Sequence, residues 1–370
     1  MFLTLGTPVA CRVTEILKDY ITRNNPLVKE LYVNLGDVKT VRILSFYPGT
    51  ENIIDRELAL SVTSPVAKPD ATVWLWREAG FSDFVRRVLG IDVGEEQRES
   101  EWLELFHLEQ DGSMGCMASV DPTGEWGVHY SFNDEYFYGL DGLGPSSWFK
   151  EGHIMVQSFF RILNLPSTSL VHGACVGVED TGVLMCARGG GGKSTLSVLA
   201  MLKGFDYVSD DYLILHKDDK GVTASPIYSF ITLSPEMYDK MYDDLDRARF
   251  LGVSPWKGKY VLDISRYRDN FRRHYPVNAL IYPEINLDAA TPSIEKCAPA
   301  DRGKTVVQIA HSTISQMGFH GFKGGQTDKV FILKTIKMLS GLDCYKITLC
   351  PDIIANVDCL RDFTRSLRNR

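Results

Sequence analysis

Four consecutive glycines stand directly before a Lys-Ser pair in the segment CARGGGGKSTL, residues 186–196. Because glycine has no Cβ, successive backbone N–H groups of such a loop can turn inward on one anion. A helix that begins at the loop adds the partial positive charge of its N-terminus. Lys193 would then reach the β- and γ-phosphates of a nucleoside triphosphate, and the Ser194 hydroxyl would ligate Mg²⁺. The predicted nucleotide-binding residues are Arg188, Gly189, Gly190, Gly191, Gly192, Lys193, Ser194 and Thr195.

The loop matches the phosphate-binding pattern G-x-x-x-x-G-K-[ST] at all but one position, because Ala187 replaces the first glycine. The alternative interpretation is a glycine-rich turn with a coincidental lysine. An apolar, strand-like run before the loop and a helix-like run after it favour the phosphate site. We therefore predict that the protein binds ATP together with Mg²⁺.

Two adjacent carboxylates, Asp210 and Asp211, follow Lys193 by 17 and 18 positions. They end a short strand-like run, at the edge of an α/β sheet where ligands usually bind. One carboxylate can hold Mg²⁺ there while the other faces an incoming hydroxyl. Solvated side chains of a simple turn are the alternative. Since a nucleotide switch needs the metal ligand but no base, the pair favours a phosphotransferase.

The apolar sequence runs on either side of the glycine loop predict which strands and helix position the loop, Lys193 and the aspartate pair. LVHGACVGV and GVLMCA indicate two strands that form a hairpin, with Gly182 supplying its turn. The glycines follow, then a helix over roughly residues 193–203 that Gly204 ends, and the strand FDYV. A strand, helix and strand in this order form a βαβ unit, whose two strands are parallel in one sheet.

The first 150 residues have a different pattern. A helix is predicted from Thr7 to about residue 24, and another around residues 81–89. Between about residues 31 and 138, short runs such as VRILSFY, ATVWLW, GCMASVD and EWGVHYSF indicate strands. GLDGLGPSS, residues 139–147, is the predicted linker. We therefore expect a β-rich α+β domain over residues 1–150, with substrate or partner binding as a hypothesis, and an α/β domain with a mixed sheet over residues 151–370.

Composition narrows the class of protein. A net charge of −7 and a pI near 5.7 give no overall attraction for nucleic acid or an anionic membrane. The eight cysteines show no zinc-binding spacing, which indicates reduced thiols. We see neither a signal sequence nor an apolar run of membrane-spanning length. The expectation is a cytoplasmic protein that binds no nucleic acid or membrane and is compatible with a homo-oligomer.

A basic segment, WKGKYVLDISRYRDNFRRHYP, occupies residues 256–276. A guanidinium from it would stabilise the charge on a transferred phosphoryl group, and Arg266 is our candidate for this role. A solvated helix face is an equally good interpretation. The segment HSTISQMGFHGFKGG, residues 311–325, lacks the context of a phosphate site and is expected to form a helix and a loop.

Residues 171–215, VHGACVGVEDTGVLMCARGGGGKSTLSVLAMLKGFDYVSDDYLIL, resemble the catalytic domain of HPr kinase/phosphorylase and its HPr-kinase-like relatives. The resemblance is carried by His172-Gly173, the Gly-Lys-Ser segment and the closely following Asp-Asp pair. CYKITLC and DIIANVDCLRDFTRSL extend it toward residue 370. We find no counterpart of the Glu-Leu-Arg-Gly type segment of HPr kinases, so the resemblance is to divergent HPr-kinase-like kinases.

This resemblance implies the P-loop fold that the family shares with ATP-dependent phosphoenolpyruvate carboxykinase. It also implies that Lys193 and Ser194 bind triphosphate and metal, that Asp210 is the general base, that Asp211 ligates the metal and that His172 neighbours the γ-phosphate. The expected activity is transfer of the γ-phosphate to a serine of a peptide or protein. A kinase of a small-molecule alcohol, such as a sugar or nucleoside, and a non-catalytic nucleotide-binding switch are the alternatives. We find no additional metal-ligand cluster in the sequence that would support carboxykinase chemistry.

Overall fold

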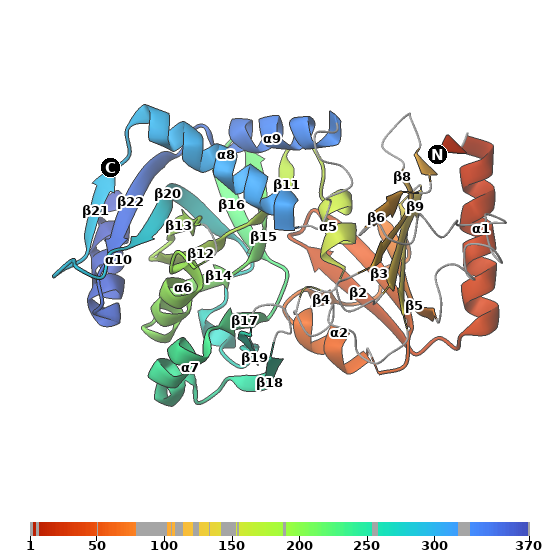
Figure 1. Cartoon of the computed structure of the whole chain (residues 1–370), viewed down its shortest axis with the longest axis horizontal. Coiled ribbons are helices and arrows are strands. Elements are labelled where there is room, and N and C mark those ends of the chain that lie inside the picture. The colour runs from red at the N-terminus through yellow and green to blue at the C-terminus, as the bar shows by residue number, and fades with distance from the viewer. Residues whose placement is uncertain are drawn as a thin grey trace. The chain divides into compact units, whose positions relative to one another are not determined.

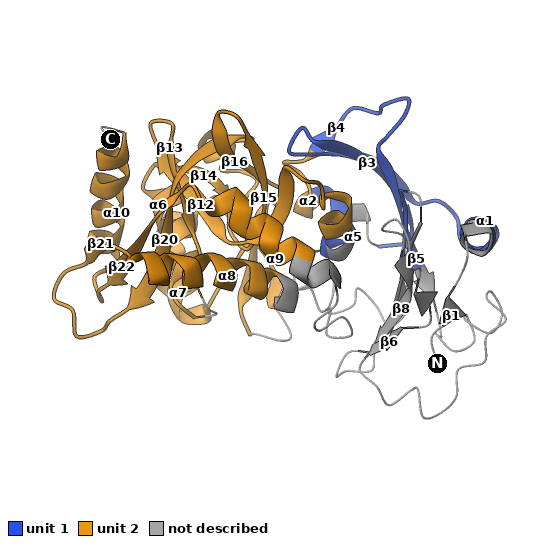
Figure 2. Ribbon diagram, turned by 90° about the horizontal axis from the view of Figure 1, so that it is seen from above, with its two compact units in different colours: residues 1–55, 62–149, 153–158 blue, residues 56–61, 150–152, 159–370 orange. Residues whose placement is uncertain are grey.

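A computed structural model of the chain describes residues 3–4, 7–49, 51–78, 102–104, 106–107, 114–120, 126–132, 134–141, 153, 155–187, 190–253, 258–316 and 326–368. The chain divides into two compact units, coloured in Figure 2. Residues 1–55, 62–149 and 153–158 form the first unit, and residues 56–61, 150–152 and 159–370 form the second. Both units contain helices and mixed sheets, which makes the protein a mixed α/β protein.

The first unit contains an eight-stranded mixed sheet with the order β4-β2-β3-β5-β10-β9-β8-β6. The pairs β3–β5 and β5–β10 are parallel, and the other pairs are antiparallel. The elements are α1 (Thr7–Asn24), β1 (Leu3–Thr4), β2 (Lys29–Leu35), β3 (Lys39–Phe46), β4 (Val62–Thr63), β5 (Ala71–Glu78), β6 (Trp102–Glu104), β7 (Phe106–His107), β8 (Met114–Val120), β9 (Trp126–Phe132) and β10 (Glu135–Asp141).

Helix α1 buries one face, because Val13, Leu17 and Ile21 recur every four residues and are all buried. The predicted first helix and the predicted strands of this region are confirmed. The predicted linker is wrong at its start, since residues 139–141 continue the pairing of β10 with β5 and β9. Residues 142–147 and the helix predicted over residues 81–89 lie outside the described residues.

The second unit has a larger mixed sheet with the order β11-β15-β16-β20-β13-β12-β14, to which β22 and β21 are added beside β20. Helices α2 (Glu51–Glu57) and α5 (Val156–Ile162) are divided between the two units. The other elements of this unit are β11 (Thr168–His172), β12 (Ala174–Val178), β13 (Thr181–Met185), α6 (Lys193–Leu202), β14 (Asp206–Ser209), β15 (Tyr212–Asp218), β16 (Gly221–Pro226), β17 (Phe230–Leu233), α7 (Pro235–Met241), η3 (Tyr242–Leu245), β18 (Arg249–Val253), β19 (Tyr260–Asp263), η4 (Arg268–Asn270), β20 (Tyr275–Ile285), β21 (Ser293–Lys296), α8 (Pro299–Gln316), α9 (Gln326–Leu339), β22 (Asp343–Leu349) and α10 (Ile353–Leu367).

Helices cover both faces of this sheet (Figure 1). Val183 and Met185 of β13 pack in one apolar core with residues of α6 and α10, whereas Leu184 packs in a second core with residues of α8 and α9. Successive strand residues point to opposite faces, so each strand serves both cores. This arrangement explains why the central strands read as continuous apolar runs rather than as alternating ones.

The hairpin before the glycine loop differs from the prediction in two ways. LVHGACVGV forms two strands, because Gly173 separates β11, which pairs with β15, from β12, which pairs with β13. The turn is formed by Glu179 and Asp180, with φ of 51° and 60°. Gly182 lies within β13 instead, where an added Cβ would stand 2.1 Å from the Pro276 oxygen. Close packing, not turn geometry, requires this glycine.

The predicted βαβ unit is confirmed in its strand direction. β12 is antiparallel to both β13 and β14, so β13 and β14 run the same way on either side of it. Helix α6 connects them and ends at Leu202, before Gly204 with φ 86°. The first strand, β13, is also parallel to β20, which is parallel to β22. The C-terminal ends of these strands therefore lie at one edge of the sheet, where ligands of α/β proteins usually bind.

Candidate active site

The end of the glycine loop adopts left-handed backbone conformations that suit glycine. Gly190 and Gly192 have φ of 82° and 87°, and Gly192 is the N-cap of α6. A Cβ on Gly190 would meet nothing within 4 Å, so its backbone conformation alone favours glycine. The first turn of α6 contains no acidic residue that would neutralise its N-terminus. Gly190, Gly191, Ser194 and Thr195 thus lie at a helix N-terminus suited to an anion, whereas Arg188 and Gly189 lie outside the described residues.

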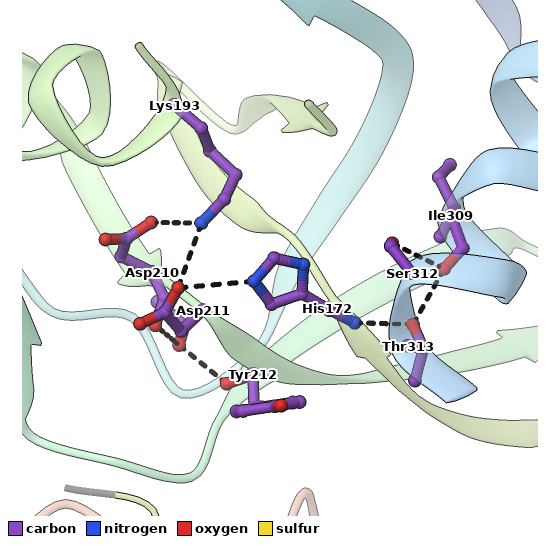
Figure 3. A network of polar contacts seen from close by, with 9 residues as sticks. His172, Lys193, Asp210, Asp211, Tyr212, Ile309, Ser312 and Thr313 are labelled. Carbon is purple, nitrogen blue, oxygen red and sulfur yellow. Dashed lines mark hydrogen bonds and ion pairs between the residues drawn. The ribbon is translucent and has the colours of Figure 1, made fainter. Parts of the chain in front are cut away.

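Lys193 points from this helix start toward the two aspartates (Figure 3). Its Nζ lies 2.6 Å from Asp210 Oδ1 and 3.3 Å from Asp211 Oδ1. Burial by itself would lower the pKa of the Lys193 amine, but the two carboxylates outweigh that effect and raise its pKa above the usual value. The lysine is therefore a buried cation held between two anions.

The two carboxylates differ in their surroundings. The Asp210 side chain is 0% exposed, and its Oδ2 is buried with no hydrogen-bond partner among the described residues. The Asp211 side chain is 17% exposed, and its backbone has φ of 78°. Its carbonyl accepts a hydrogen bond of 2.8 Å from Gly173 N, which extends the β11–β15 pairing to the site. A buried carboxylate oxygen without a donor is costly, unless a ligand or cation completes the site.

His172 is placed at the end of β11 by the same strand pairing. Its Nε2 lies 3.3 Å from Asp211 Oδ1, and since a carboxylate only accepts, Nε2 carries the proton of this hydrogen bond. Its backbone N–H donates to Thr313 Oγ1 at 2.8 Å, and that hydroxyl donates to Ile309 O at 2.8 Å (Figure 3). Burial is the main cause that lowers the pKa of His172 below 6.5, so the imidazole is neutral at neutral pH.

This histidine predicts a pH dependence of stability. Because the folded-state pKa is below 6.5, the unfolded chain binds more protons between the two values, and acidification through this window favours unfolding. We expect the wild-type protein to lose more stability than His172→Gln between about pH 7.5 and about pH 5. Denaturant titrations at both pH values measure this difference. Equal losses in the two proteins would contradict a buried neutral His172.

Four of the predicted residues are brought together and one is not. His172, Lys193, Asp210 and Asp211 form one connected polar cluster. The Arg266 side chain is exposed, and among the described residues it makes no polar contact with that cluster. The described part of its segment, residues 258–276, forms β19, the short 3₁₀ helix η4 and the start of β20, so a solvated helix face is limited to residues 268–270. Arg272 of this segment pairs with Asp206 at 2.5 Å.

Thr313 contacts this cluster through the His172 backbone, and the sequence did not suggest it. It lies in the segment of residues 311–325, whose predicted helix is confirmed through Gln316, while residues 317–325 lie outside the described residues. A Thr on an apolar helix stripe gives no signal of a contact made 141 residues away. In the described part of the chain, no group of three or more His, Cys, Asp or Glu side chains could hold a metal by itself.

Mg²⁺ at such a site does not need a cluster of that size. It is typically bound by one or two carboxylates together with phosphate oxygens and waters. Asp211, the Ser194 hydroxyl and Asp210 Oδ2 can supply oxygen ligands of the kind that Mg²⁺ prefers. The residues present therefore fit a magnesium ion that arrives with a triphosphate.

Comparison with known proteins gives only a distant likeness. Neither the family models nor the curated proteins compared with the sequence give a match. Among solved structures, the HPr(Ser) kinase/phosphatase from Coxiella burnetii is similar, with 13% sequence identity and a TM-score of 0.30. The match covers 54% of this chain and 98% of that one. A likeness this distant does not assign the chain to a family.

No helix among the described residues has the length and hydropathy to cross a membrane.

Proposed function

We propose that the protein is an ATP- and Mg²⁺-dependent kinase that transfers the γ-phosphate to an acceptor hydroxyl. The observation that carries the proposal is the buried cluster of Lys193, Asp210 and Asp211 at the start of the helix that follows the glycine loop. A cation for the phosphates, a carboxylate for a metal and a second carboxylate for a proton are the parts that phosphoryl transfer needs.

Each residue of the cluster has a role in this proposal. The loop N–H groups and Lys193 bind the phosphates, and Ser194 and Asp211 hold Mg²⁺. Bound Mg²⁺ would neutralise charge on the phosphate oxygens. Asp210 accepts the proton of the acceptor hydroxyl. The hydroxyl oxygen bonds to the γ-phosphorus while the bond from that phosphorus to the leaving ADP breaks. His172 neighbours the γ-phosphate and orients Asp211 through their hydrogen bond.

The charge of the cluster supports dependence on Mg²⁺. One lysine and two carboxylates sum to −1, because His172 is neutral. A triphosphate without a cation would meet an excess of negative charge in a poorly solvated site. The second carboxylate also favours a kinase, because a simple anion-binding loop would have no use for it.

The acceptor we propose is a serine side chain in a peptide or protein, with residues 1–150 binding the acceptor or another partner. A small-molecule alcohol is the second candidate, and a nucleotide-binding switch is the candidate from another class. An apolar α/β core and a phosphate loop do not distinguish the acceptors, because acceptor pockets are built from residues distant in the chain.

Transfer of label from γ-labelled ATP in a cell extract, with Mg²⁺ and with or without the protein, tests the proposal. We expect label in a peptide or protein only when the protein is added, and phosphoserine after hydrolysis of that product. Label in a small metabolite would favour the second acceptor class. Label found only as free phosphate, or left on ATP despite tight binding, would contradict a kinase and favour the switch.

A further inference from the structure

Two aliphatic side chains stand against the glycine loop at the edge of the sheet. β20 and β22 are parallel, and their last residues, Ile285 and Leu349, are directly paired. A Cβ placed on Gly192 would lie 2.7 Å from Leu349 Cδ1 and 3.5 Å from Ile285 Cγ1. Both side chains therefore lie within van der Waals reach of the residue that caps the phosphate-binding helix.

The two side chains differ in exposure. Leu349 is buried, but Ile285 is 47% exposed although it ends a central strand. The strand pairing continues one residue further, through a hydrogen bond of 2.9 Å from Asn286 N to Leu349 O. Leu287 follows and is 74% exposed. Single exposed aliphatic residues are common on proteins, so exposure alone assigns nothing. What distinguishes Ile285 is that this partly exposed side chain places Cγ1 and Cδ1 3.5 Å and 3.6 Å from a Cβ built on Gly192, beside the predicted phosphate site.

We propose that the exposed face of Ile285, backed by Leu349, binds the nucleobase of the phosphate donor. This inference rests on the proposed function, since it requires phosphates on the glycine loop. A nucleotide held there by its phosphates extends its base beyond the loop, and a flat aromatic ring gains by covering aliphatic carbon. Ligand sites typically combine such apolar walls with a few polar groups.

The consequence concerns the class of phosphate donor. A loop and a lysine alone would bind inorganic tripolyphosphate about as well as ATP, because both present the same phosphate groups. An apolar surface for the base favours the nucleotide. The donor is therefore a nucleoside triphosphate rather than an inorganic polyphosphate.

Calorimetric titration of ATP and of tripolyphosphate, each with Mg²⁺, into the wild-type protein and Ile285→Ala tests this inference. We expect ATP to bind the wild type more tightly than tripolyphosphate. Ile285→Ala should weaken ATP binding about fivefold, from the lost contact of its methyl and methylene groups, and leave tripolyphosphate binding within about twofold. Leu333 is an exposed aliphatic residue on α9, so Leu333→Ala is the matched control. It should change neither the affinity for ATP nor the affinity for tripolyphosphate.

The outcomes separate the two proposals. A wild-type protein that binds neither ligand would overturn the nucleotide site and the base site with it. Equal binding of both ligands to the wild type, or unchanged ATP binding in Ile285→Ala, would overturn the base site alone. An equal loss for both ligands in Ile285→Ala would show that Ile285 only supports the loop, and would likewise overturn its role in binding the base.

Discussion

Asp210→Asn is expected to abolish phosphoryl transfer while nucleotide binding survives. Asparagine keeps the size of the side chain but cannot take the proton of the acceptor, so turnover should fall by about 10²- to 10⁴-fold. Lys193 keeps Asp211 as an ion-pair partner at 3.3 Å, so the cation that we propose to bind the phosphates remains in place. ATP affinity should therefore stay within about threefold of the wild-type value.

The labelled-ATP assay and calorimetry on the same protein samples measure both quantities. Asp206→Asn is the control, because Asp206 begins β14, the strand that ends just before Asp210, but pairs with Arg272 and the Tyr275 hydroxyl rather than with Lys193. We expect it to leave turnover within about twofold. Unchanged turnover in Asp210→Asn would remove its role as the base. Loss of ATP affinity together with turnover would instead indicate that Asp210 holds the metal.

Lys193→Met is expected to have the largest effect on the folded protein. Methionine fills the space of the lysine stem but leaves the Asp210 carboxylate buried without its cation, and Asp211 loses the same partner. Removing one member of a buried ion pair typically costs about 3–5 kcal/mol. The variant should also lose binding of ATP and tripolyphosphate alike, since it lacks the charge that both require.

Denaturant unfolding of Lys193→Met, Asp210→Asn and the double variant separates charge from packing. The double variant should recover stability relative to Lys193→Met, because the buried carboxylate is gone. Lys193 has a raised pKa, so its contribution to stability is fully present below the unfolded value of about 10.4 and is lost only as the pH rises through the raised value. Measurements near pH 7 thus see the whole effect. A Lys193→Met protein as stable as the wild type would contradict the buried ion pair.

Local features of the fold followed from the sequence where short-range physics decides them. The helix after the glycines begins at Lys193 and ends before Gly204, as expected from a glycine at each end. The order of the strands in the sheet of the second unit did not follow from the sequence. β12 lies between β13 and β14, and Gly182 is needed for packing against Pro276, 94 residues along the chain. Such pairings depend on which apolar faces meet across the sheet, and a run of apolar residues does not specify its partner.

Arg266 shows the same limit at the site. Its charge and its position in a basic segment fitted a phosphate clamp, but the path of the chain leaves its side chain exposed and without a polar contact to the cluster in the described residues. A cluster of basic residues indicates only that positive charge is present. Where a guanidinium points is decided by the path of the chain, which places Arg266 between β19 and η4.

The sequence by itself predicted that the glycine loop, Lys193 and the aspartate pair form one site, because only 17 positions separate Lys193 from Asp210 and one helix lies between them. Only the tertiary structure decided that Asp211 meets His172 and that Thr313 holds the His172 backbone, a contact across 141 residues. It also decided that Ile285 and Leu349 stand against Gly192. These neighbours are set by strand register and helix packing, which join distant segments through contacts that no local pattern encodes.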